Sequence, residues 1–191
     1  MAFSLSFLVM VDMGTDSFTQ MNLAISGALH ISLGNWQCFF NIALFLLVII
    51  FGGNDIGWGT LANMICIGYL LDFFAWLWGH LLPAGLFDSM VVRLIVMVIA
   101  LVVFVFSAAI YMDGGLGTSP CDAIPFILYR KISEKKPGIP LRVVRICYDF
   151  AMILITFCII HRFYLVTVLM ALSLGPVIEF VGKNIKKWFK L

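Results

Sequence analysis

Long apolar runs constrain this chain more than any other feature of its sequence. The most extended one, residues 90–112, contains a single charged side chain, Arg93, and four more runs cover residues 36–51, 60–78, 141–160 and 164–180. A run of about 20 apolar residues crosses a bilayer as a helix, and hydrocarbon admits only structures whose backbone amides are bonded internally. Because these runs lack the polar–apolar alternation of barrel strands, they predict an all-α integral membrane protein.

The composition agrees with this prediction and excludes a water-exposed domain. Of the 191 residues, 63% are hydrophobic and only 12% are charged, which leaves too few polar side chains to cover a surface in water. The lipid bilayer is therefore the partner that the composition predicts. No pattern in the sequence indicates a nucleic-acid partner.

A sixth apolar segment, residues 2–13, is too short to cross a bilayer alone. We expect it to form a short helix, or a helix that residues preceding Met1 would complete. The segments 18–31 and 120–132 predict short re-entrant or interfacial helices, each shortly after a glycine turn. With the segment 2–13 counted, we expect six transmembrane helices, three in each half of the chain.

The order of these segments indicates an internal duplication. When one half is shifted over the other by 103 to 108 positions, Gly14 aligns with Gly117, Thr60 with Thr167, Gly68 with Gly175, Asp72 with Glu179, and Asn41 with Asp149. Since each half holds an odd number of crossings, the second copy must be inverted relative to the first. The sequence therefore predicts two inverted three-helix repeats, residues 1–82 and residues 83–191.

The two glycine turns form the first candidate site. The turn residues are Gly14 and Thr15 in the first half and Gly115, Gly117, Thr118, Ser119, Pro120 and Asp122 in the second. Ser119 is expected to cap the helix that follows, with Pro120 at its first position, and Ser17 with Gln20 to form a capping box. Free amides at such helix starts bind anionic groups in transporters. A turn that only redirects the chain is the alternative.

Charged side chains inside the apolar runs form the second candidate site. Each costs about 2.5–3.5 kcal/mol or more to insert, so it normally faces a partner or a watery cavity. The candidates that we expect to line a substrate path or to form ion pairs are Asp72, Arg93, Arg145, Asp149 and Glu179, with the polar Asn41. We expect Asp72 to pair with Arg93 and Glu179 with Arg145, either as gates or as fixed structural pairs. Arg145 and Asp149, four residues apart, could also satisfy each other.

The distribution of charge predicts the orientation in the membrane. Residues 1–92 contain five aspartates and neither lysine nor arginine, whereas all twelve basic residues lie from Arg93 onward. They cluster at residues 130–145 and 183–190, and the positive-inside bias places both clusters in the cytoplasm. With six crossings, both termini are then cytoplasmic. The basic tail is expected to bind lipid headgroups.

Sequence motifs give no indication of catalysis. The chain has no phosphate loop, dinucleotide fingerprint or metal-binding spacing, and its five cysteines are scattered without a C-x-x-C pair. We therefore expect neither an enzyme nor a cofactor, and no metal site.

The run Gly115-Leu116-Gly117-Thr118-Ser119-Pro120-Cys121-Asp122, followed by Gly138-Ile139-Pro140, Arg145 and Gly175-Pro176-x-x-Glu179, resembles the YczE/YyaS/YitT family of small bacterial integral membrane proteins. The resemblance implies a six-helix protein of the bacterial plasma membrane but no particular substrate. The first half departs from the family pattern. Ser17 or Phe18 stands where the proline would be, and Thr19 stands where the aspartate would be.

These observations favour a small-solute transporter or permease whose substrate the sequence does not identify. One alternative is a substrate-binding membrane subunit that requires an ATPase partner, as in energy-coupling-factor transporters. Another is a non-transporting membrane factor that assists assembly or regulation through its basic loop. Whether the protein forms a homo-oligomer is left open by the sequence.

Overall fold

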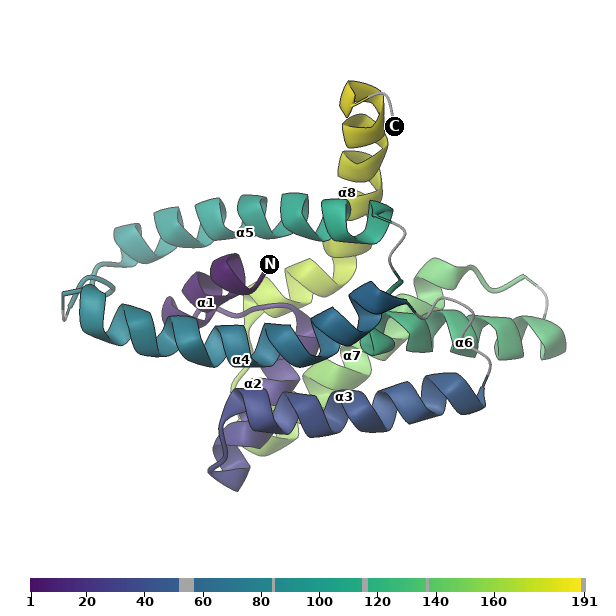
Figure 1. Cartoon of the computed structure of the whole chain (residues 1–191), viewed down its shortest axis with the longest axis horizontal. Coiled ribbons are helices and arrows are strands. Elements are labelled where there is room, and N and C mark those ends of the chain that lie inside the picture. The colour runs from purple at the N-terminus through teal and green to yellow at the C-terminus, as the bar shows by residue number, and fades with distance from the viewer. Residues whose placement is uncertain (52–56, 84, 115–116, 137, 190–191) are drawn as a thin grey trace.

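The computed structural model describes residues 1–51, 57–83, 85–114, 117–136 and 138–189, which fold into helices without a strand. Within these ranges the helices are, in chain order, α1 (Ala2–Met10), α2 (Ser17–Leu29), α3 (Leu33–Ile50), α4 (Trp58–Leu81), α5 (Met90–Asp113), α6 (Pro120–Lys135), α7 (Leu141–Ile160) and α8 (Leu165–Phe189) (Figure 1). The all-α class expected from the apolar runs is confirmed.

Five of these helices are long and apolar enough to cross a membrane. The candidate spans are Leu33–Ile50 in α3, Trp58–Leu81 in α4, Met90–Met112 in α5, Leu141–Ile160 in α7 and Leu165–Gly182 in α8. They correspond to five of the six expected crossings. The remaining one, α1, has only 9 residues and is too short to span a bilayer, which takes about 20. The chain is thus a multi-pass membrane protein with five candidate spans and a short first helix.

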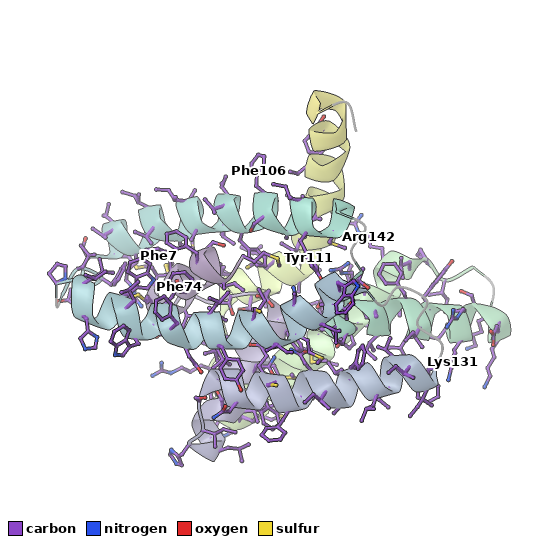
Figure 2. The ribbon with its side chains drawn as sticks, in the orientation of Figure 1. Phe7, Phe74, Phe106, Tyr111, Lys131 and Arg142 are labelled. Atoms are coloured by element: carbon purple, nitrogen blue, oxygen red, sulfur yellow. The ribbon has the colours of Figure 1, made fainter. Side chains whose placement is uncertain are left out.

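The outer surface of the spans is apolar. Phe39 on α3 is 71% exposed, and Val91 on α5 and Leu154 on α7 are also largely exposed. Figure 2 shows Phe106 directed away from the rest of the molecule on the outer side of α5. Apolar surface this extensive is rare in water, and lipid tails are the environment that suits it.

The short helix α1 lies inside the molecule, between α4 and α5 (Figure 1). Leu8 of α1 and Val11, which follows its last turn, are fully buried and pack in one apolar cluster with Leu71 of α4, Phe104 of α5 and other residues of α5 and α8. Burying an aliphatic side chain of this size contributes about 1.5–3 kcal/mol relative to leaving it in water. A helix that is too short to span is therefore held by protein contacts on several sides.

The remaining helix contacts come in matching sets. α3 packs against α4 and α7 against α8, while α1 packs against α4 and α5 against α8. Across the two halves, α2 packs against α7 and α6 against α3, and α1 packs against α5. Each contact within residues 1–82 thus has a counterpart within residues 83–191. Between the halves, the α2–α7 contact matches the α6–α3 contact, whereas the contact of α2 with α8 has no comparable counterpart between α6 and α4.

Glycines allow α3 and α4 to cross closely. A Cβ on Gly68 would lie 3.0 Å from the Cα of Gly34, and a Cβ on Gly34 would lie 2.7 Å from Asp72 Oδ2. The Gly34 amide donates a hydrogen bond to that same carboxylate oxygen over 2.8 Å. Small residues at a crossing bring helix backbones together in membranes, and here the approach also gives Asp72 a donor.

We expect Gly34→Ala to destabilise the protein. The added methyl group would overlap Asp72 and the ring of Tyr69, and overpacking of this kind costs about 1–3 kcal/mol. Gly79→Ala on the same α4 is the matched control, since a Cβ there meets nothing within 4 Å. The stability of both variants can be measured by unfolding them in detergent and monitoring intrinsic fluorescence. Equal stability of the two would contradict a tight crossing at Gly34.

Candidate functional site

Both glycine turns dock on a threonine at the start of a spanning helix. Gly117 has a φ of +100°, and a Cβ there would lie 2.5 Å from both Gly57 N and Thr60 Oγ1, at the start of α4. Gly14 has a φ of +114°, and its Cβ would lie 2.7 Å from Thr167 Oγ1, at the start of α8. Each turn therefore needs glycine for its backbone angle and for the close approach. Gly115 lies outside the described residues.

The two docking contacts differ in their hydrogen bonds. Thr60 Oγ1 donates to the Thr118 carbonyl over 2.7 Å and accepts from the Gly57 amide over 3.1 Å. Thr167 Oγ1 is buried and has no hydrogen-bond partner within the described part of the chain. The Gly117 turn is thus fastened to α4 by its backbone, whereas the Gly14 turn touches α8 without such a bond.

Short side chains cap the helix that follows each turn. Ser119 Oγ accepts from the Asp122 amide over 3.2 Å, and Pro120 takes the first position of α6, both as predicted. The predicted capping box of Ser17 and Gln20 is wrong. The N-cap of α2 is Asp16, which accepts from the Thr19 amide over 2.9 Å. A carboxylate one residue earlier takes this place, and Gln20 reaches back to the amide and hydroxyl of Thr15 instead.

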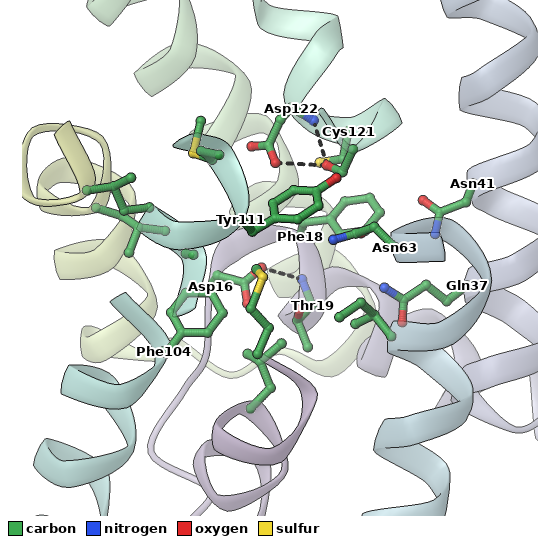
Figure 3. A pocket seen from close by; sticks show the side chains of 18 of the residues that line it. Asp16, Phe18, Thr19, Gln37, Asn41, Asn63, Phe104, Tyr111, Cys121 and Asp122 are labelled. Carbon is green, nitrogen blue, oxygen red and sulfur yellow. Dashed lines mark hydrogen bonds between the residues drawn. The ribbon is translucent and has the colours of Figure 1, made fainter. Parts of the chain in front are cut away.

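Between these helix starts lies a central cavity of about 100 Å³. Its polar lining residues are Asp16 and Thr19 from the first turn and α2, Gln37 and Asn41 from α3, Asn63 from α4, Tyr111 from α5, Ser119 and Asp122 from the second turn and α6, and Arg145 from α7. In Figure 3, Gln37 and Asn41 enter the cavity region from one side, with Asp16 and Asp122 on the other. Both halves of the chain therefore contribute to a single cavity.

A smaller cavity of about 60 Å³ adjoins the central one. The two share Asp16, Asp122 and Arg145, and the smaller one also contains Ser17 and Asp149. Ser17 Oγ donates to Asp149 Oδ1 over 2.6 Å. This bond links the start of α2 to the middle of α7, which is the longest-range polar contact of the site.

Carboxylates outnumber cations around the two cavities. Arg145 Nη2 forms an ion pair with Asp122 Oδ1 at 3.1 Å, while the Ser119 hydroxyl donates to the other oxygen of Asp122. Asp16 and Asp149 add two further carboxylates, and Arg145 is the single Lys or Arg among the described lining residues. The site therefore has an excess of negative charge when its carboxyl groups are ionised.

Two residues that line the central cavity each have an acceptor atom without a donor. Asp16 Oδ1 and Gln37 Oε1 are buried, and over the described ranges neither has a hydrogen-bond partner. Asp16 lies between α1 and α2, outside the five candidate spans. Burial raises the pKa of the Asp16 carboxyl, and the bond from the Thr19 amide opposes this rise. A buried acceptor without a donor costs about 1–3 kcal/mol, so a ligand group that donates a hydrogen bond to Asp16 would offset this cost.

Of the two ion pairs expected from the sequence, the one between Asp72 and Arg93 does not form. Asp72 accepts from the Gly34 amide rather than from Arg93, whose Nε donates to the Val11 carbonyl over 2.7 Å. Arg145 forms an ion pair with Asp122, and the expected pair with Glu179 involves a side chain that lies outside the described part. For Asp72 and Arg93 the physical reason is the position of backbone groups. The Gly34 amide lies within hydrogen-bond distance of Asp72, and the Val11 carbonyl within hydrogen-bond distance of Arg93.

The structure brings together some of the predicted site residues and separates others. Asn41, Ser119, Pro120, Asp122, Arg145 and Asp149 gather around α6 and the cavities, with Asn41 Nδ2 also donating to the Met64 carbonyl over 3.1 Å. Asp72 and Arg93 line neither cavity.

Sequence reasoning missed several cavity residues, among them Asp16, Gln37, Asn63 and Tyr111. The spacing of the internal duplication could have identified two of them. Asp16 stands 103 positions before Ser119, and Gln37 stands 108 positions before Arg145. Searching for the counterpart of each second-half candidate would therefore have found both.

Comparison with protein families places the chain in one of them. The model of a family described as a family of unknown function (DUF6198) matches residues 1–183. The chain belongs to this family. For this DUF6198 member, no match was found among curated proteins or among solved structures. The family assignment agrees with a resemblance to uncharacterised membrane proteins and does not establish the YczE/YyaS/YitT family itself.

Proposed function

We propose that this DUF6198 protein is a small-solute transporter, with the central cavity as its substrate site. The observation that carries the proposal is that one polar cavity lies between two capped helix starts from different halves of the chain. Broken helices that meet at a substrate site between two repeats are typical of secondary transporters. Polar groups within membrane helices normally line such paths.

The reciprocal helix contacts support a two-fold arrangement of the halves. Residues of the cavity wall also fall in register, since Thr19 and Asp122 are 103 positions apart, and Gln37 and Arg145 are 108 apart. Gly68 packs on Gln37 as Gly175 packs on Arg145. We infer from this that residues 1–82 and 83–191 are inverted repeats that rock about the cavity, in the bacterial plasma membrane with both termini in the cytoplasm.

Uptake into liposomes tests this function. Purified protein reconstituted alone would be offered a mixture of isotope-labelled amino acids, polyamines, sugars, nucleosides and carboxylic acids, and the vesicle contents would be analysed by mass spectrometry. We expect at least one class to accumulate above the level of protein-free vesicles. No accumulation of any class would contradict the proposal, and uptake that requires an added ATPase would favour the substrate-binding subunit instead.

A matched pair of variants assigns the uptake to the cavity. Ala108 is buried and lines the cavity, whereas Ala151 on α7 is exposed. We expect Ala108→Leu to reduce uptake at least tenfold because the larger side chain fills the cavity, and Ala151→Leu to leave it unchanged. Equal uptake by the two variants, with equal amounts of folded protein, would place the path elsewhere.

A further inference from the structure

The helix starts at the cavity do not offer a free site for an anion. Asp16 and Ser119 already accept an amide of the first turn in α2 and α6. Each start also carries its own carboxylate, Asp16 or Asp122, whose negative charge offsets the partial positive charge of the helix dipole. An anionic ligand would face like charge at both turns.

The cationic side chain of the lining is already paired. Both oxygens of Asp122 are in use, one by Arg145 and the other by Ser119. Asp16 keeps one buried oxygen without a donor within the described residues. Arg145, the one Lys or Arg side chain of the described wall, is already bound to Asp122, so no described side chain of the wall offers Asp16 a positively charged donor.

The rest of the wall suits an organic ligand. Aromatic rings of Phe18, Phe104 and Tyr111 line the cavity together with apolar side chains such as Leu5 and Ile67. Aromatic faces attract cations, and apolar side chains suit an alkyl chain better than the hydration shell of a metal ion. With about 10–15 Å³ needed for each water, a cavity of about 100 Å³ has room for roughly seven to ten water-sized groups, which is enough for a small organic molecule.

We propose that the central cavity binds a small organic cation, with an ammonium or guanidinium group beside Asp16 and a short apolar chain against the aromatic wall. This inference rests on the proposed transport function and names the substrate class of the same site. The cation donates an N–H group to Asp16 Oδ1, and its positive charge balances that of the Asp16 carboxylate.

Three ligands of equal chain length test the charge requirement. The whole protein in detergent would be titrated with n-butylammonium, n-butanol and butyrate, and both the calorimetric affinity and the melting temperature would be measured. We expect n-butylammonium to bind at least tenfold more tightly than the other two and to raise the melting temperature. Equal binding of all three, or preference for butyrate, would overturn the proposal.

Two variants locate the binding group. Asp16→Asn keeps an oxygen that can cap α2 but removes the charge, and we expect at least a tenfold loss of n-butylammonium affinity. Asp88→Asn, in an exposed loop, should leave the affinity unchanged. In the double variant Asp16→Asn/Asp122→Asn, Arg145 loses its partner, and the preference should shift to butyrate. If the double variant does not fold, the single variant Asp16→Asn still tests the proposal. A wild-type affinity for n-butylammonium in Asp16→Asn would show that the cation does not bind at Asp16.

The binding and uptake experiments fail independently. Binding of n-butylammonium in detergent without uptake of any solute into liposomes would retain the cation site and contradict transport. Uptake of a neutral or anionic solute, together with no binding of n-butylammonium, would retain transport and overturn the cation site.

Discussion

Gly117→Ala is expected to lower the free energy of unfolding by about 2–5 kcal/mol, because two costs add at this position. A side chain at a φ of +100° is strained, which costs about 1–2 kcal/mol for a residue other than glycine. The new Cβ would also lie 2.5 Å from the backbone nitrogen of Gly57. Since this neighbour is backbone, relief requires the start of α4 to move away from the turn.

Two control variants separate these costs. Gly138 has a φ of +120° but nothing within 4 Å of its Cβ position, so Gly138→Ala should show backbone strain alone. Gly27 lies in α2 with open space around it, and Gly27→Ala should be neutral or stabilise by up to about 1 kcal/mol. Denaturant titration in mixed micelles measures the free energy of unfolding of each of the three variants. If Gly117→Ala lowers the free energy of unfolding no more than Gly138→Ala does, the turn does not dock on α4.

Valine at Thr60 and at Thr167 is expected to act in opposite directions, although the two threonines are in register. Thr60→Val removes a hydroxyl that bonds Thr118 and Gly57, and leaving buried backbone groups without partners should cost about 2–3 kcal/mol. Thr167→Val removes a buried hydroxyl that bonds nothing in the described part of the structure. Its loss should be neutral or stabilising, because no hydrogen bond is broken and a polar atom leaves the interior.

The same unfolding assay measures the stability of both valine variants, and each variant serves as the control for the other. Because valine matches threonine in shape, packing changes little, and the difference reports the hydrogen bonds. A fall in stability at Thr167 equal to that at Thr60 would mean that the two docking contacts are alike. In a transporter, the contact without a hydrogen bond is the one expected to open first, so Thr60→Val should also increase proteolysis near α4.

The apolar runs sufficed to predict the helices, because in lipid the backbone must satisfy its hydrogen bonds internally and few structures do so. The spans of α3, α4, α5, α7 and α8 follow the apolar runs, and the glycine turn with Ser119 and Pro120 begins α6 as expected. The start of α2 was misplaced by one residue, since Asp16, Ser17 and Thr19 can all cap a helix. The backbone angles of the folded chain decide which of these residues is the N-cap.

Side-chain partners were harder to predict than helices. Asp72 was paired with Arg93 on the basis of charge, but a glycine crossing brings the Gly34 amide within 2.8 Å of that carboxylate. A prediction based on charge alone does not take backbone donors and acceptors into account. Likewise, Arg145 finds Asp122 in the first turn of α6 because α6 and α7 pack together.

The sequence by itself determined that the chain forms membrane helices, where they lie, and which glycines break them, because these properties depend on local composition and on backbone chemistry in lipid. Tertiary structure alone decided that α1 is buried between α4 and α5, and that Asp16 and Gln37 share a cavity with Arg145. Some of these residues, such as Gln37 and Arg145, are more than 100 positions apart. Their distances follow from the packing of whole helices, which no local pattern encodes.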